Sequence, residues 1–170
     1  MLYVELLTVV VLIVVNGLLA MSELAIVSAR PARLRPLEAK SRGAAAALRL
    51  GEHPGRFLST VQIGITLVGI LSGALSGATL GARLTQTLVD RGVDPDWAAN
   101  LGVGVVVVAI TYVSLIVGEL VPKQLALRNP EKLAITMAPA MLMLSRVAAP
   151  LVWLLDRSGR GILWLLGQRG

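Results

Sequence analysis

The stretch that decides the fold runs from Trp97 to Lys123 and reads WAANLGVGVVVVAITYVSLIVGELVPK. It carries no charge as far as Gly118, and a transmembrane helix needs about 20 apolar residues. Glu119 follows directly, and Pro122 has no N–H to donate to the carbonyl of Gly118, so we expect a free backbone oxygen beside a carboxylate. Because a carboxylate at membrane depth costs roughly 2.5–3.5 kcal/mol, these oxygens predict a cation site.

The composition of this 170-residue chain is that of an integral membrane protein. Hydrophobic residues make up 55% of it, charged residues only 15%, and the mean hydropathy is +0.76. Three stretches are long enough to cross a bilayer, at about residues 2–29, 57–82 and 97–127. We therefore predict one all-α integral membrane domain that occupies residues 1–170.

The loop between the first two predicted spans is strongly basic. By the positive-inside rule this loop is cytoplasmic, which places the N-terminus outside. Its leucines and alanines predict a helix over about residues 31–50, held on the anionic inner leaflet by its charge. Nucleic-acid binding is the other interpretation of the high pI, but no fold signature or interleaved aromatic residues support it. The basic residues are Arg30, Arg33, Arg35, Lys40, Arg42, Arg49 and Arg56.

Beyond Pro130 the chain has two apolar segments that are each too short to span a bilayer alone. We predict helices that lie in or against the interface over about residues 131–167, with Arg146, Arg157 and Arg160 toward lipid headgroups. A fourth span is the alternative, because a single arginine is tolerated on insertion scales.

The second predicted span has a glycine at every fourth position, a spacing that lets helices approach closely in lipid. Helix packing alone would explain the glycines, but it explains the hydroxyls of Ser72 and Ser76 less well. Glycines also expose backbone carbonyls, which membrane transporters use to build cation sites. The glycines are Gly69, Gly73, Gly77 and Gly81.

The first predicted span has a polar face, since Asn16 and Glu23 are seven residues apart and Ser22 lies beside Glu23. One interpretation is hydrogen bonding between helices, with Glu23 protonated or paired to Lys123. The other is that oxygen-rich faces on all three spans bind a hard cation such as Mg²⁺, Na⁺ or Ca²⁺.

Several classes of chemistry have too few residues to support them. The chain has no cysteine, which excludes disulfides and thiolate metal sites. His53 is its only histidine, so zinc-type chemistry has almost no ligands. No nucleophile, base and orienting group occur together, and we therefore do not expect an enzyme.

Three motifs follow one another along the chain: NGLLAMSELA (16–25), EHPGRFLSTVQIGITL (52–67) and GELVPK (118–123). Together they resemble the transmembrane domain of the CorC/CNNM (cyclin M) magnesium transporters. The resemblance implies three transmembrane helices with a belt of juxtamembrane helices, forming a homodimer in the plasma membrane. In that family cytoplasmic CBS-pair domains normally follow, and their absence from these 170 residues suggests a piece of a longer protein.

The same resemblance implies export of Mg²⁺, commonly in exchange for Na⁺, through a site formed by all three helices. Where the family often has asparagines this chain has Ile65, Thr66 and Gly69, so Gly69 can offer only its carbonyl. The alternatives are a membrane anchor or Mg²⁺ sensor that does not transport, and a purely structural dimer module. Carried over residue by residue, the metal-binding residues would be Ser22, Glu23, Gly69, Ser72, Ser76 and Glu119, with Asn16 next in line.

Overall fold

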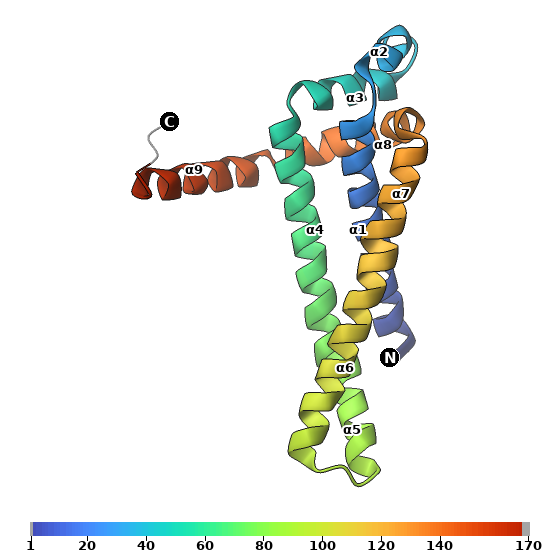
Figure 1. Ribbon diagram of the computed structural model, residues 1–170, viewed down its shortest axis with the longest axis vertical. Coiled ribbons are helices and arrows are strands. Elements are labelled where there is room, and N and C mark those ends of the chain that lie inside the picture. Colours follow the sequence, from blue (N-terminus) through green and yellow to red (C-terminus); the bar gives the residue numbers. More distant parts are fainter. Residues whose placement is uncertain (1, 168–170) are drawn as a thin grey trace. The chain divides into compact units, whose positions relative to one another are not determined.

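The computed structural model describes residues 2–167, which form helices joined by short turns and loops, with no strand (Figure 1). The chain divides into two compact units. The first unit consists of the chain up to Met21 and of Gly64–Arg128, and the second consists of Ser22–Ile63 and the chain from Asn129 onward.

Three helical stretches are long and apolar enough to cross a membrane, which confirms the three predicted spans. The second stretch continues eight residues past its predicted end at residue 82, because the polar segment before Asp90 stays helical. The N-terminus outside remains a prediction. The stretches are Tyr3–Ser28, Pro54–Asp90 and Pro95–Arg128.

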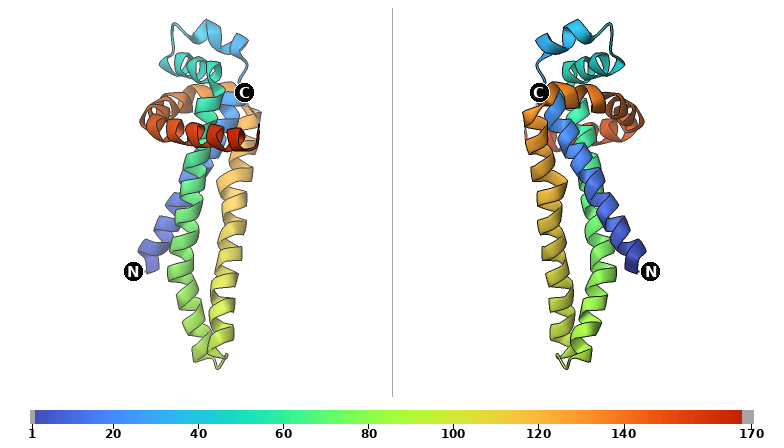
Figure 2. Two further views of the ribbon diagram at one scale, coloured as in Figure 1. Left: turned by 90° about the vertical axis from the view of Figure 1, so that its left-hand side faces the viewer. Right: turned by 90° about the vertical axis from the view of Figure 1, so that its right-hand side faces the viewer.

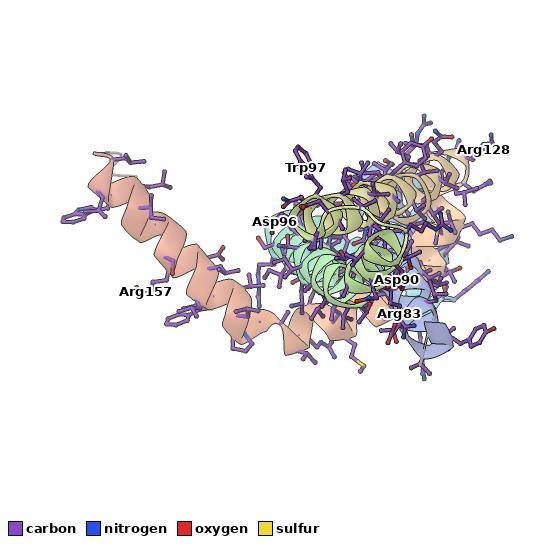
Figure 3. All side chains as sticks on the ribbon, turned by 90° about the horizontal axis from the view of Figure 1, so that it is seen from below. Arg83, Asp90, Asp96, Trp97, Arg128 and Arg157 are labelled. Carbon is purple, nitrogen blue, oxygen red and sulfur yellow. The ribbon has the colours of Figure 1, made fainter. Side chains whose placement is uncertain are left out.

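In the first unit the second and third spans form an antiparallel hairpin (Figure 2). Gly92 turns the chain with φ +88°, a left-handed conformation that glycine adopts without strain. The Asp94 side chain then caps the next helix by accepting the backbone N–H of Asp96 at 3.0 Å, and Asp90 and Asp96 lie near this end of the hairpin (Figure 3). The hairpin consists of part of α4 (Pro54–Ser76), η2 (Gly77–Gly81), α5 (Ala82–Asp90), α6 (Pro95–Leu115), η3 (Ile116–Leu120) and α7 (Val121–Arg128).

Two glycines let the arms of the hairpin pack closely. A Cβ atom on Gly81 would lie 3.2 Å from the Cα atom of Val103, and one on Gly102 would lie 2.6 Å from the backbone nitrogen of Thr85. Of the four glycines spaced four residues apart in the second span, only Gly81 therefore makes a close helix contact within the described chain. A Cβ atom would meet nothing within 4 Å at its other positions, Gly69, Gly73 and Gly77.

The basic loop, for which the sequence predicts a helix over residues 31–50, folds as three short helices. Pro36 disfavours α-helical backbone at the residue before it, and the helix is interrupted until Ser41 caps the next one by accepting the N–H of Ala44 at 3.3 Å. The three helices are α2 (Pro31–Leu34), η1 (Arg35–Leu37) and α3 (Arg42–Glu52).

The second unit is held together by the packing of α3 on α8 (Pro130–Val147), which Gly43 allows. A Cβ atom on Gly43 would overlap the carbonyl oxygen of Ile135. Helix α9 (Ala149–Leu165) follows at a bend of 64°. If α8 and α9 are counted as one broken span they form a fourth crossing, so the interfacial placement remains a prediction.

Gly102→Ala should destabilise the hairpin by roughly 1–3 kcal/mol, the cost typical of overpacking, because its Cβ atom would press on the backbone of Thr85. Gly104→Ala is the matched control on the same helix, since a Cβ atom there meets nothing within 4 Å. Thermal unfolding in detergent measures both variants. A melting temperature of Gly102→Ala at or above that of the control would contradict the close packing.

Candidate cation site

A cavity of about 280 Å³ lies in the first unit and is lined by residues from all three spans. Its walls combine apolar side chains with hydroxyl, amide and carboxylate groups. The lining residues are Asn16 from α1, Ile65, Gly69, Ser72 and Gly73 from α4, Ile110, Thr111, Ser114 and Leu115 from α6, and Glu119 from η3.

Ser72 is one of the lining residues, and its hydroxyl oxygen is buried without a partner in the described chain. Its residue is only 5% exposed, and its Oγ makes no hydrogen bond within the described residues. Leaving a buried polar group unpaired costs roughly 1–3 kcal/mol. An unpaired hydroxyl at this position is thus a candidate ligand for a bound cation.

Ser76, one helical turn further along, is bonded differently. Its hydroxyl donates to the carbonyl oxygen of Ser72 at 2.6 Å and to that of Gly73 at 3.2 Å. Bonding to a carbonyl three or four residues earlier is usual for serine inside a helix. Ser76 is not among the residues that line the cavity, so its hydroxyl serves the helix.

Asn16 connects the first span to the third. Its Nδ2 donates to the carbonyl oxygen of Gly118 at 3.0 Å. The prediction of a free oxygen at Gly118 is therefore wrong. The carbonyl oxygen that Pro122 cannot bond accepts a hydrogen bond from the side-chain amide of Asn16 instead. The other amide atom, Oδ1, is buried without a hydrogen-bond partner in residues 2–167 and supplies a second unpaired acceptor.

Small residues on both helices allow this contact. A Cβ atom on Gly17 would lie 3.0 Å from Cγ of Pro122, and one on Gly118 would lie 3.2 Å from Nδ2 of Asn16. The backbone of η3 is a π-helix, a conformation that occurs mostly as single turns within α-helices and often at functional sites. The tight contact thus holds Asn16 beside the turn that carries Glu119.

Glu119 is half-buried and already has a cationic partner. Its Oε1 accepts a hydrogen bond from Nζ of Lys123 at 2.7 Å, and the two side chains are 38% and 34% exposed. Lys123, which the sequence offered as a partner for Glu23, therefore pairs with Glu119. A cation that reaches this carboxylate must compete with an ammonium group or share the carboxylate with it.

The predicted metal ligands are found in three different situations. The cavity is lined by Gly69, Ser72 and Glu119, while the hydroxyl of Ser76 is bonded within α4. The remaining two, Ser22 and Glu23, belong to the second unit, where Ser22 is buried and Glu23 is half-buried, and their role as ligands remains a prediction.

Two polar residues of the wall, Thr111 and Ser114, are absent from the predicted set. With Gly118 they occupy positions i, i+3 and i+7 of the third span, which place them on one helical face. That spacing is readable from the sequence. It carries little weight alone, since hydroxyls in apolar spans commonly bond to their own helix.

The donor set is hard but weakly charged. Within residues 2–167 no three carboxylate, imidazole or thiol groups come together as they would in a high-charge metal cage. The cavity instead offers one carboxylate with neutral amide and hydroxyl oxygens. This combination suits a cation that keeps part of its water shell, as Mg²⁺ usually does in proteins.

Comparison with known proteins places the chain in a family. Residues 7–170 match the family model of the cyclin M transmembrane N-terminal domain. Over 146 residues, 85% of this chain, it is 48% identical to UPF0053 protein sll0260 of Synechocystis, covering 33% of that protein. It is 30% identical over 136 residues, 79% of this chain, to the polyamine export protein of Haemophilus influenzae, covering 31% of it.

A third relative is UPF0053 protein YhdP of Bacillus subtilis, which is 32% identical over 146 residues, 85% of this chain and 33% of that protein. The chain thus spans about one third of the length of these relatives. The match covers nearly all of the chain, including most of the first span, the whole of the other two and the cavity. The chain belongs to the cyclin M transmembrane N-terminal domain family.

Proposed function

We propose that this chain is the membrane domain of a cation exporter that carries Mg²⁺ through the cavity of the first unit. One observation supports the proposal above the others. Three spans contribute Asn16, Ser72 and Glu119 to a single cavity, and two of these side chains have buried acceptors that no described residue satisfies.

The proposed site would select by chemistry and by size. Carboxylate, amide and hydroxyl oxygens are ligands for hard cations, and Mg²⁺ prefers octahedral oxygen ligands at about 2.0–2.1 Å with several retained waters. Exchange for Na⁺, also a hard cation, is part of the proposal. Ser22 and Glu23 extend it as further ligands on α1, and Gly69 would contribute through its carbonyl.

A polyamine or another organic ammonium ion is the second candidate substrate. The Haemophilus influenzae relative is named a polyamine export protein, and Glu119 already binds an ammonium group, that of Lys123, at 2.7 Å. The apolar walls formed by Ile65, Ile110 and Leu115 would suit the methylene chain of such a substrate. A membrane anchor or Mg²⁺ sensor without transport is the further alternative.

Glu119→Gln should abolish measurable transport, because it removes the one carboxylate among the described residues that line the cavity while keeping the shape of the side chain. The protein is reconstituted in liposomes, and efflux of Mg²⁺ and of spermidine is measured in parallel. Asp96→Asn is the control, since Asp96 is an exposed carboxylate outside the cavity. Spermidine flux without Mg²⁺ flux in the wild type would favour the second candidate, and binding of Mg²⁺ without flux of either would favour the sensor.

Ser72→Ala should weaken Mg²⁺ binding about tenfold, because a lost ligand hydrogen bond or contact is commonly worth about 1.4 kcal/mol. It should cost little stability, since the hydroxyl has no partner to lose. Ser76→Ala should do the reverse and lower stability by roughly 0.5–1.5 kcal/mol with Mg²⁺ affinity kept. Calorimetry and thermal unfolding report the two quantities. Equal Mg²⁺ affinity in Ser72→Ala and the wild type would remove Ser72 from the site.

We further propose that the chain forms a homodimer in the plasma membrane and precedes cytoplasmic CBS-pair domains. Gly69, Gly73 and Gly77 support the dimer, because small residues at this spacing are typical of helix contacts in lipid and a Cβ atom on any of them would meet nothing within 4 Å in the described chain. Light scattering of the purified chain in detergent should give the protein mass of two copies. A mass of one copy would contradict the proposed dimer.

A further inference from the structure

A second cavity, of about 150 Å³, lies in the other unit and has the opposite charge. It is lined by side chains from the C-terminal part of α3, the first turn of α4 and the C-terminal part of α8. Three arginines and a histidine, all of them exposed, are among its lining residues, together with Phe57 and Ser145. The basic residues are Arg49, His53, Arg56 and Arg146.

The positive charge of this cavity is not balanced by the protein. None of the three arginines takes part in an ion pair within the described residues, and none of their guanidinium groups donates a hydrogen bond there. Like charges gathered around one cavity repel one another. Ser145 adds an Oγ that is buried and has no hydrogen-bond partner in the same part of the chain.

Ordinary helix electrostatics explain two of the arginines but not the third. Arg49 and Arg146 lie in the last turns of α3 and α8, where a cation is favoured by the partial negative charge of a helix C-terminus. Arg56 lies in the first turn of α4, where the helix end is itself positive. An anion between these groups would offset the repulsion between Arg56 and the helix N-terminus, because it would attract the arginines and the helix N-terminus together.

We propose that this cavity binds a phosphate group. Arginine forks match phosphate oxygens in a bidentate way, and a free serine hydroxyl can donate to a further oxygen. The cavity adjoins the first turn of a transmembrane span, where Phe57 is 1% exposed and forms an apolar base. Basic pockets at such membrane boundaries suit lipid headgroups, so the favoured source of the phosphate is an anionic phospholipid.

Native mass spectrometry of the full chain in detergent, titrated with phosphatidylglycerol, tests the proposal. The wild type should retain the lipid in a saturable way, and Arg56→Gln and Arg146→Gln should each lower its affinity by at least about tenfold, as expected for loss of a charge-assisted pair. Arg157→Gln removes the same charge from α9 and lies outside the cavity (Figure 3). Its affinity should equal that of the wild type.

Two further measurements keep the result interpretable. Circular dichroism checks that each variant is folded, and Arg56→Lys, which keeps the charge without the planar fork, should retain an intermediate affinity. Pyrophosphate added in competition separates the sources, because displacement of the lipid by pyrophosphate at a similar concentration would assign the site to a soluble phosphate. An equal loss in Arg157→Gln, or lipid affinity unchanged in both cavity variants, would overturn the proposal.

Discussion

The hydrogen bond from Asn16 to the carbonyl of Gly118 is the interaction on which the cavity of the first unit depends. Inside a bilayer every backbone acceptor needs a partner, because water is not available to supply one. Pro122 cannot donate to Gly118, and a side chain of another helix supplies the donor. Asn16 can reach it because Gly17 and Gly118 leave no side chain in the way. The hydrogen bond that satisfies this carbonyl therefore also holds the first span against the turn that carries Glu119.

The cavity holds its polar groups in an unsatisfied state. Oδ1 of Asn16 and Oγ of Ser72 are buried without partners in the described chain, and Glu119 is neutralised by Lys123 from its own helix. Unpaired buried polar atoms cost stability, a cost that is common at functional sites. Because the ammonium competes for the carboxylate, an incoming cation would be held only moderately. Moderate affinity suits transport, which requires the ion to leave as well as to enter.

Features that depend on long stretches of sequence can be predicted for this protein, whereas features that depend on single side-chain contacts cannot. The spans follow from long apolar runs, and Glu119 stands out because a carboxylate at the end of such a run is costly. The distinction between Ser72 and Ser76 is not readable, since both are serines four residues apart on one helix and only the structure shows which hydroxyl is bonded. The partner of Gly118 is likewise hidden, because it comes from a residue 102 positions away.

The basic cavity shows the same limit more strongly. From sequence, Arg49 and Arg56 are members of a charged loop for which attraction to an anionic membrane surface is sufficient explanation. The structure brings them to one cavity with Arg146 from a distant helix.

Among the described residues the buried side-chain atoms without a hydrogen bond are Oε2 of Glu5, Oδ1 of Asn16, Oγ of Ser72 and Oγ of Ser145.

Their distribution is informative, because native proteins leave few buried polar atoms unpaired and each one calls for an explanation. Oε2 of Glu5 lies 3.4 Å from Nε of Arg83 and is accounted for by that ion pair. Each of the others belongs to a residue that lines one of the two cavities. The lining of the first cavity also includes Glu119, so unpaired oxygens there suit a cation, whereas the lining of the second includes three arginines, so an unpaired hydroxyl there suits an anion. In the second cavity the unpaired hydroxyl and the unpaired arginines thus favour the same proposed ligand, whereas in the first the unpaired oxygens favour a cation although Lys123 already pairs with the carboxylate.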